Sequence, residues 1–217
     1  MPIAICCDFD GTVTLSDTGK ELLSKLTTAD WQAIDKFVID GQIGTREALI
    51  KQWGMIEHTT WEEIFNIVDT IQIDPTFYSF HNWITQHNLK FLILSDGFET
   101  YIHRILRNHK IDSASLNILA NDVELINNKL KLKFNTQVCN HNCANCKYSV
   151  VQQLQREGYS IIYIGDGLSD ILPAAELADV IYARRNEDLA KKLQGDSRLK
   201  IFDNFKEIKE DIERNLL

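Results

Sequence analysis

Two carboxylates follow an apolar segment near the start of the chain. Asp8 and Asp10 come directly after the run Ile3-Ala4-Ile5-Cys6-Cys7, and Gly11 follows them. On an extended chain, residues i and i+2 point to the same side, so both carboxylates can enter one crevice at the end of a strand. Two like charges so close together are tolerated when a cation lies between them or when one carboxyl group keeps its proton. Both conditions suit phosphoryl transfer, and the alternative is a helix-capping aspartate with a solvated neighbour.

Three later segments carry further groups of the kind that phosphoryl transfer needs. Ser95 and Gly97 end a second apolar run, where a hydroxyl and a glycine amide can bind phosphate oxygens. Lys147 begins an apolar stretch at helical spacing, which places its ammonium group at a helix start unless it is a solvated surface lysine. Asp166 and Asp170 follow a third apolar run and are spaced to share one face of a helix. The carboxylates form a hard, oxygen-rich set that suits Mg²⁺.

In this order and context, the segments resemble the four motifs of the haloacid dehalogenase superfamily of phosphatases, and the resemblance extends along nearly the whole chain. The matching residues, in motif order, are Asp8 with Asp10, then Ser95, then Lys147, and last Asp166 with Asp170. Each motif alone is a weak pattern. Four in the right order, three of them directly after apolar runs, indicate membership of the superfamily.

The resemblance implies a mechanism with a covalent intermediate. Asp8 would attack phosphorus and form an aspartyl-phosphate. Asp10 would protonate the leaving oxygen and later deprotonate the attacking water. Mg²⁺ would be held by Asp8, the Asp10 carbonyl group and Asp166. Lys147 and Ser95 would orient the phosphate oxygens.

Three points stay open at this level. Asp170 either reaches the metal through water or hydrogen-bonds Lys147. A second alcohol could accept the phosphoryl group in place of water, so a phosphotransferase is an alternative to a phosphatase. A protein that binds a phosphorylated metabolite without catalysis is a further alternative, although such a protein has no need of a nucleophile such as Asp8.

Composition limits the class of protein. The chain has 217 residues, of which 44% are apolar, and this is enough for one core domain with a substantial insertion. No run approaches the ~18 uninterrupted apolar residues that a membrane span needs, and the first residues carry no signal-peptide pattern. A net charge of −8 argues against a nucleic-acid backbone as partner. We expect a cytoplasmic protein without a membrane or nucleic-acid partner, and its oligomeric state is left open.

The order of apolar patterns predicts a core that is interrupted once. Residues 15–72 show apolar residues at helical spacing and no convincing strand, which predicts a small helical cap. Residues 1–14 and 73–217 would form the core, with strands near 90–95, 115–120, 160–165, 179–183 and 198–202 that alternate with helices. This alternation predicts the α/β class, with a doubly wound, mostly parallel, Rossmann-like sheet.

Two local signals refine this plan. Asp74-Pro75 predicts the start of a core helix, with Asp74 as N-cap and Pro75 at the first helical position. Residues 123–132 alternate around Asn127-Asn128, which predicts a β-hairpin.

The position of the cap resembles the phosphoserine phosphatase branch of the superfamily, whose helical cap covers the site and selects the leaving group. A lid that excludes water also restricts the substrate to a small phosphorylated metabolite. Asp17 stands where that branch often has an acidic residue for a substrate amine, and Arg46 could meet a carboxylate or carbonyl group. The alternative for each residue is a surface or capping role.

A cysteine-rich segment lies directly before the third motif. Cys139, Cys143 and Cys146, with His141 among them, concentrate four soft ligands within eight residues, a set that zinc favours. Reduced, packed thiols are the alternative, and a disulfide is disfavoured in an intracellular compartment. The spacing is also similar to the iron–sulfur loop of radical S-adenosylmethionine enzymes, but Asn145 stands where those usually have an aromatic residue. A structural zinc site is therefore an open possibility beside the Mg²⁺ site.

The cysteine-rich approach to the third motif, the helical cap and Ser95-Asp96-Gly97-Phe98 together look like the methionine-salvage branch, which dephosphorylates 2-hydroxy-3-keto-5-methylthiopentenyl-1-phosphate. Related branches act on phosphoserine, pyridoxal phosphate or phosphocholine. We expect a Mg²⁺-dependent phosphatase of a small phosphomonoester, with that compound as the first candidate substrate and phosphoserine or another phosphometabolite as the alternative.

Overall fold

Strands and helices alternate along most of the chain. The computed structural model describes residues 2–215. Within these residues the strands are β1 (Ile3–Cys7), β2 (Lys90–Phe98), β3 (Asn117–Ile126), β4 (Lys129–Lys133), β5 (Ser160–Gly165), β6 (Val180–Arg184) and β7 (Leu199–Phe202). The helices are α1 (Thr18–Leu26), α2 (Gln32–Ile39), α3 (Thr45–Trp53), α4 (Trp61–Val68), α5 (Phe77–Gln86), α6 (Glu99–Asn108), the short 3₁₀ helix η1 (Ser113–Ser115), α7 (Lys147–Arg156), α8 (Leu168–Leu177), α9 (Asp188–Lys192) and α10 (Phe205–Asn215).

The strands form one sheet in the order β4-β3-β2-β1-β5-β6-β7. Neighbouring strands are parallel except for β3 and β4, which pair antiparallel. The chain builds the sheet outward from β1 on one side and then returns to build it outward from β1 on the other side. β1 therefore lies at the point where the strand order reverses, and open α/β sheets bind ligands at the carboxyl ends of the strands there. The predicted α/β class with a mostly parallel sheet is confirmed.

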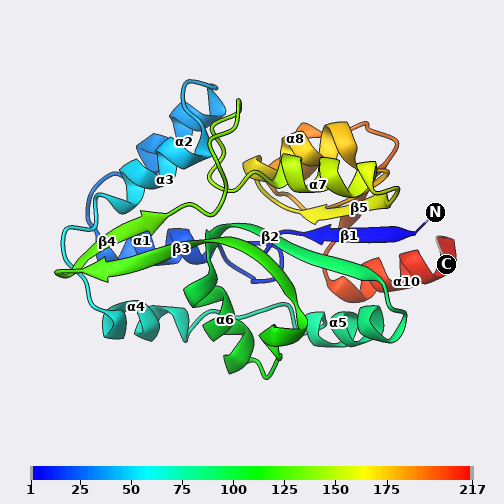
Figure 1. Ribbon diagram of the computed structural model, residues 1–217, viewed down its shortest axis with the longest axis horizontal. Helices are drawn as coiled ribbons and strands as arrows, with labels where there is room; N and C mark the ends of the chain where they lie inside the picture. Colours follow the sequence, from blue (N-terminus) through cyan, green and yellow to red (C-terminus); the bar gives the residue numbers. More distant parts are fainter. Residues whose placement is uncertain (1, 216–217) are drawn as a thin grey trace.

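Helices cover both faces of the sheet. Figure 1 shows α7 and α8 on one face and α5, α6 and α10 on the other. Ala4 and Cys6 pack in the cluster under α7 and α8, whereas Ile5 and Cys7 pack in the cluster on the opposite face. This alternation is the two-residue period of a strand, and both faces are apolar because neither meets water. Cys6 and Cys7 are fully buried and serve as small hydrophobic residues.

The chain between β1 and β2 is helical. Residues 15–72, all of which the structure describes, contain α1 to α4 and no strand. The segments that enter and leave this region run side by side, since the Leu15 amide donates to the Gln72 carbonyl oxygen at 2.8 Å and the Asp74 amide to the Val13 carbonyl oxygen at 2.9 Å. The helical prediction holds, whereas the division of the chain into a core and a cap domain stays a prediction.

The predicted start of the next helix is wrong by two residues. α5 begins at Phe77, and the N-cap position is Thr76. The Asp74 carboxylate accepts hydrogen bonds from the Thr76 amide at 2.9 Å and from the Thr76 hydroxyl at 2.6 Å. It also lies 3.5 Å from the Arg184 guanidinium. These contacts fix Asp74 in a turn before the helix, which the local sequence alone does not reveal.

The β-hairpin is where the sequence placed it. Ile126 of β3 pairs with Lys129 of β4, and both turn residues have positive φ, 50° for Asn127 and 61° for Asn128. This is the backbone that a two-residue hairpin turn needs and that asparagine tolerates. The strand expected near 115–120 and the first strand of the hairpin are one continuous strand, β3.

Among residues 2–215, none of the helices has the length and apolar character that crossing a membrane would take.

Candidate active site

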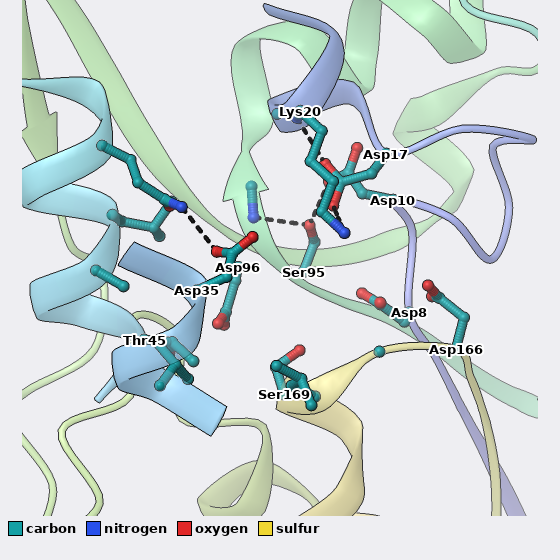
Figure 2. A pocket seen from close by; sticks show the side chains of 18 of the residues that line it. Asp8, Asp10, Asp17, Lys20, Asp35, Thr45, Ser95, Asp96, Asp166 and Ser169 are labelled. Carbon is teal, nitrogen blue, oxygen red and sulfur yellow. Dashed lines mark hydrogen bonds and ion pairs between the residues drawn. The ribbon is translucent and has the colours of Figure 1, made fainter. Parts of the chain in front are cut away.

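The predicted acidic residues meet at one edge of the sheet. Cys7 of β1 lies opposite Ile164 of β5, and the Asp8 amide continues the ladder by donating to the Ile164 carbonyl oxygen at 2.9 Å. Asp8 and Asp166 therefore leave two neighbouring strands at the same level, and Ser95 of β2 lies on the other side of β1. Figure 2 shows the side chains of Asp8 and Asp166 next to each other at this edge.

Lys147 is buried between two carboxylates. Its Nζ lies 2.8 Å from Asp8 Oδ1 and 2.7 Å from Asp170 Oδ1, and the lysine side chain is only 2% exposed. Burial by itself would lower the pKa of Lys147, but the charges of Asp170, Asp8 and Asp96 outweigh burial and raise it. Lys147 is therefore a permanent ammonium ion that points at Asp8 from the first turn of α7.

Asp170 is satisfied by protein donors. Besides Lys147, the Tyr163 hydroxyl donates to its Oδ1 at 2.8 Å, and the amides of Asp166 and Gly167 donate to its Oδ2 at 3.1 Å each. Of the two contacts that the sequence left open for Asp170, the structure shows the hydrogen bond to Lys147.

Asp10 has a different environment from Asp8. Its Oδ2 accepts hydrogen bonds from the Ser95 hydroxyl at 3.1 Å and from the Tyr101 hydroxyl at 2.9 Å. Its Oδ1 is buried and has no hydrogen-bond partner among the described residues. Burial, followed by the negative charge of Asp17, raises the pKa of Asp10 to about 6. A carboxyl group tuned in this way can hold a proton near neutral pH and release it.

Gly97 is required by the close approach of Tyr101 and Asp10. A Cβ atom at this position would lie 1.8 Å from the Tyr101 hydroxyl oxygen and 2.6 Å from Asp10 Oδ2. The Gly97 amide also donates to the Ser95 hydroxyl oxygen at 2.9 Å. The glycine therefore leaves room for the hydroxyl groups that hold Asp10.

Three carboxylates form a group that fits a divalent cation. Oxygen atoms of Asp8, Asp166 and Asp170 lie within 4.8 Å of one another. Burial and then the charge of Asp170 raise the pKa of Asp8 well above its usual range and that of Asp166 to about 7. One ammonium ion does not balance three carboxylates, so full ionisation needs a further positive charge. The oxygen donors and the uncompensated charge fit Mg²⁺.

A cavity of about 270 Å³ opens in front of these groups. Its walls come from the strand ends and from α1, α2 and α3 (Figure 2). Asp17 lines this cavity and also caps α1, because its side chain accepts a hydrogen bond from the Lys20 amide at 2.9 Å. The Lys20 ammonium group lies 3.5 Å from the same carboxylate. Asp17 therefore both caps α1 and lines the cavity.

The contacts of Arg46 contradict its predicted role at the substrate. Its guanidinium group donates to the carbonyl oxygens of Cys143 at 3.1 Å and Thr136 at 2.5 Å, and it lies 4.3 Å from the ring centre of Phe134. Arg46 is absent from the described residues that line the cavity. The helical spacing predicts that a charged residue lies on the outward face of its helix. It does not show which neighbouring segment the side chain contacts.

The cysteine-rich segment is partly assembled. The ligand atoms of Cys139, His141 and Cys143 lie within 4.8 Å of one another, and Cys146 is outside that group. All three cysteines are free thiols. The segment therefore has no disulfide, and the zinc ion suggested by its spacing stays a prediction.

Two residues at the site were not found from the sequence. Tyr101 holds Asp10, and the Thr12 hydroxyl donates to Asp166 Oδ1 at 2.5 Å. Thr12 follows Gly11 within the first motif, so its place in the sequence was enough to indicate a role at the site. Tyr101 gave a weaker one, since it stands three residues after Phe98 on the buried side of α6 and reads as an ordinary core residue.

Comparison with known proteins decides the family. Over residues 3–214 the chain matches the model of a family named Putative Phosphatase. The chain belongs to this phosphatase family. The predicted haloacid dehalogenase-type fold and the predicted class of enzyme, a hydrolase of phosphomonoesters, are confirmed. The alternative of a non-catalytic binding protein is set aside.

Individual relatives agree with this result. The chain is 28% identical over 214 residues to a 2-hydroxy-3-keto-5-methylthiopentenyl-1-phosphate phosphatase of Bacillus velezensis, which covers 96% of this chain and 89% of the relative. It is 25% identical over 189 residues to the enzyme of the same name from Bacillus cereus, with 85% and 84% covered. A solved phosphoserine phosphatase, described as a phospho-aspartyl intermediate analogue, has a TM-score of 0.74 at 17% identity, with 97% and 98% covered.

Replacement of Tyr101 by Phe should lower kcat for an alkyl phosphate by roughly 10- to 100-fold. The reason is that a hydrogen bond to a charged group is worth about 1.5–3 kcal/mol, and this one orients Asp10. The measurement is phosphate release under saturating substrate, together with the urea midpoint of unfolding. Tyr78→Phe, at a tyrosine that is 53% exposed, is the matched control and should leave kcat unchanged. An unaltered kcat in Tyr101→Phe would show that Asp10 does not depend on this hydroxyl.

Proposed function

We propose that the protein hydrolyses a small phosphomonoester through an aspartyl-phosphate on Asp8, with Mg²⁺ as cofactor. The proposal rests on one observation. The carboxylates of Asp8 and Asp10, two residues apart, have partners of different kinds. Asp8 lies against the Lys147 ammonium, whereas Asp10 lies against two hydroxyl groups in a buried place. Different environments give two carboxyl groups different roles, one as a nucleophile and one as an acid and base.

The residues divide the reaction into two displacements. In the first, an Asp8 oxygen forms a bond to phosphorus, the bond from phosphorus to the ester oxygen breaks, and Asp10 gives its proton to that oxygen. In the second, water attacks the phosphorus, Asp10 takes a proton from the water, and Asp8 is released with inorganic phosphate. The solved relative described as a phospho-aspartyl intermediate analogue supports this route.

Other side chains hold the transferred group. Lys147, whose Nζ lies 2.8 Å from Asp8 Oδ1, and the Ser95 hydroxyl, which lies beside Asp10, would bind phosphate oxygens. Asp8, Asp166 and the Asp10 carbonyl group would hold Mg²⁺, and Thr12 would orient Asp166. When bound, Mg²⁺ supplies the positive charge that the carboxylates lack and that the phosphate requires.

We further propose that residues 15–72 act as a cap that selects the leaving group. The cap side of the cavity has an apolar wall formed by Val38, Ile39, Leu49 and Trp53. Among the described residues that line the cavity, Lys20 is the one cation, and Asp17 already pairs with it. A substrate carboxylate would find no free positive charge, whereas an uncharged chain with a thioether end would contact the apolar wall.

The cavity therefore favours 2-hydroxy-3-keto-5-methylthiopentenyl-1-phosphate over phosphoserine. The names of the Bacillus relatives agree with this choice. Phosphoserine remains the second candidate because Asp17 and Asp35 line the cavity and could bind its ammonium group. A cytoplasmic location and the absence of membrane and nucleic-acid partners remain predictions, and the oligomeric state is open.

The substrate proposal predicts the ratio of the kcat/KM values for the two candidate substrates. kcat/KM for the methylthiopentenyl phosphate, generated enzymatically in the assay, should exceed that for phosphoserine by at least about tenfold, because a methylene group alone is worth 10- to 200-fold in an apolar pocket. Leu49→Asn should lower the first value and leave the second within about twofold. Candidate alcohols added while free phosphate is followed would reveal transfer in place of hydrolysis. Faster release from phosphoserine would reverse the assignment.

Asp8→Asn should reduce turnover roughly 10³-fold or more, because an amide cannot form the acyl-phosphate. Circular dichroism should show the same fold. Asp10→Asn is the matched comparison, since it removes the proton carrier and keeps the nucleophile. With p-nitrophenyl phosphate, whose leaving group needs no proton, Asp10→Asn should slow the first displacement, measured in a single turnover, much less than with an alkyl phosphate, and Asp8→Asn should abolish this step with both. Equal losses in the two variants would contradict the division of roles.

Activity should depend on a divalent cation. EDTA should abolish turnover and Mg²⁺ should restore it, whereas Ca²⁺ in excess should inhibit because it prefers more ligands and looser geometry. Thr12→Val removes the hydroxyl group that holds Asp166 and should raise the Mg²⁺ concentration for half-maximal activity by 10- to 100-fold. The measurement is a Mg²⁺ titration of the metal-free enzyme. Full activity of Mg²⁺-free protein would refute the metal role.

A further inference from the structure

The segment between β4 and α7 is long and irregular. Residues 134–146, called the cysteine loop below, span 13 positions without a helix or strand. Loops of this length inside a domain are uncommon, and they usually have a function or need a fixed support. Figure 1 shows this yellow-green segment near α2 and α3 before it continues into α7.

The loop contains three ligand-type side chains outside the hydrophobic core. Cys139 and Cys143 are half-buried and His141 is exposed, unlike the fully buried Cys6 and Cys7 of β1. Packing of thiols in the core therefore does not explain them. Their ligand atoms lie within 4.8 Å of one another. Sulfur atoms that share a tetrahedral zinc ion at about 2.3 Å lie about 3.8 Å apart, so small side-chain shifts would complete the geometry.

Two further features suit a metal. The Cys143 amide donates a hydrogen bond to Cys139 Sγ at 3.4 Å, a contact that stabilises a thiolate ligand. The second feature is a fourth ligand, which a structural zinc site needs. Cys146 supplies another sulfur, since it is buried at the N-cap of α7 three residues after Cys143.

One side of the loop is attached to α3. The Arg46 amide donates to the Asn142 carbonyl oxygen at 3.1 Å, and the Ala144 amide donates to the Thr45 hydroxyl oxygen at 2.9 Å. The backbones approach so closely that a Cβ atom on Gly44 would lie 2.4 Å from the Asn142 carbonyl oxygen. The Arg46 guanidinium group adds its hydrogen bonds to the same loop. The first turn of α3 therefore depends on the shape of the cysteine loop.

The other side of the loop is attached to the site. The Asn145 amide donates to Asp96 Oδ1 at 3.0 Å, and its side chain donates to the Ser95 carbonyl oxygen at 3.0 Å. Lys147 follows two residues later. The loop thus joins the helix α3 of the cavity wall to the strand end that carries Ser95.

We propose that Cys139, His141 and Cys143, completed by Cys146, bind one zinc ion, and that this ion fixes the loop as a clasp between α3 and the Lys147 segment. Soft thiolate and imidazole ligands select zinc, whereas the carboxylates beside Asp8 select Mg²⁺. The two sites are therefore separate in place and in chemistry. The zinc site does not rest on the proposed reaction.

Metal content tests the site. Protein purified without chelator and exposed to Zn²⁺ should retain about one zinc per chain after gel filtration, measured by mass spectrometry of the elements. His141→Ala should lower zinc affinity at least tenfold in competition with a chromogenic chelator. His58→Ala, at another exposed loop histidine, should not, and neither should Asp8→Asn, which alters only the carboxylate site. Co²⁺ in place of zinc should show the thiolate charge-transfer and visible bands of tetrahedral coordination, and His141→Ala should weaken them.

Several results would overturn this assignment. They are less than a tenth of an equivalent of zinc with fully reactive thiols, zinc that persists in His141→Ala but is lost in Asp8→Asn, a disulfide within the loop, or iron in place of zinc. Because the wild-type metal content and the cobalt spectrum need no variant to fold, the test does not depend on the stability of His141→Ala.

Hydrogen exchange tests the clasp. Removal of zinc should speed exchange of the backbone amides of residues 139–146 and 44–48 by at least tenfold, because metal binding supplies the order of both segments. Amides of α10 should be unaffected. Unchanged exchange at residues 44–48 would show that the metal, if bound, does not support α3.

Discussion

The burial of one lysine among carboxylates is the constraint on which the rest of the site depends. Transfer of a charged group out of water costs several kcal/mol per ion, and one unpaired partner leaves that cost uncompensated. Lys147 meets Asp8 and Asp170 at once, so its own charge is balanced. Asp10 and Asp166 remain, and each is held by hydroxyl donors. The surplus of negative charge that is left makes the edge of the sheet a place for Mg²⁺ and a phosphate group together.

The glycines of the motifs follow from the same crowding. A Cβ atom on Gly165 would lie 2.5 Å from Asp170 Oδ2, and one on Gly11 would lie 2.4 Å from Asp166 Oδ2. Gly11 also has a φ of 83°, which disfavours other residues. Carboxylates that converge on a small volume leave no space for side chains on the backbone beside them. The positions of the acidic residues and the positions of the glycines in the sequence therefore follow from the same physical requirement.

This requirement explains which features could be predicted from the sequence. Asp8 and Asp166 directly follow apolar strands and Ser95 lies near the end of another, and parallel strands bring their carboxyl ends to one edge, so local patterns were enough to place them together. Arg46 was assigned to the substrate wrongly because a helical period does not show how α3 packs on a loop about 90 residues later in the chain. Tyr101 was missed for the same reason, since its partner Asp10 lies in the turn after β1, 91 positions earlier in the chain. The local sequence pattern does not show contacts between elements that are far apart in the chain.

The inserted helices are held to the sheet in two different ways. At the end of α3, Trp53 packs edge-on against Phe98 with ring centres 4.8 Å apart, in an apolar cluster that also includes Leu22. At the start of α3, the contacts are hydrogen bonds to the cysteine loop. Water can replace hydrogen bonds at little net cost, whereas separation of apolar surfaces exposes area at about 25 cal/mol per Å². The apolar end is thus the fixed one, and the polar end is where the shape of the cavity can be adjusted without loss of the core.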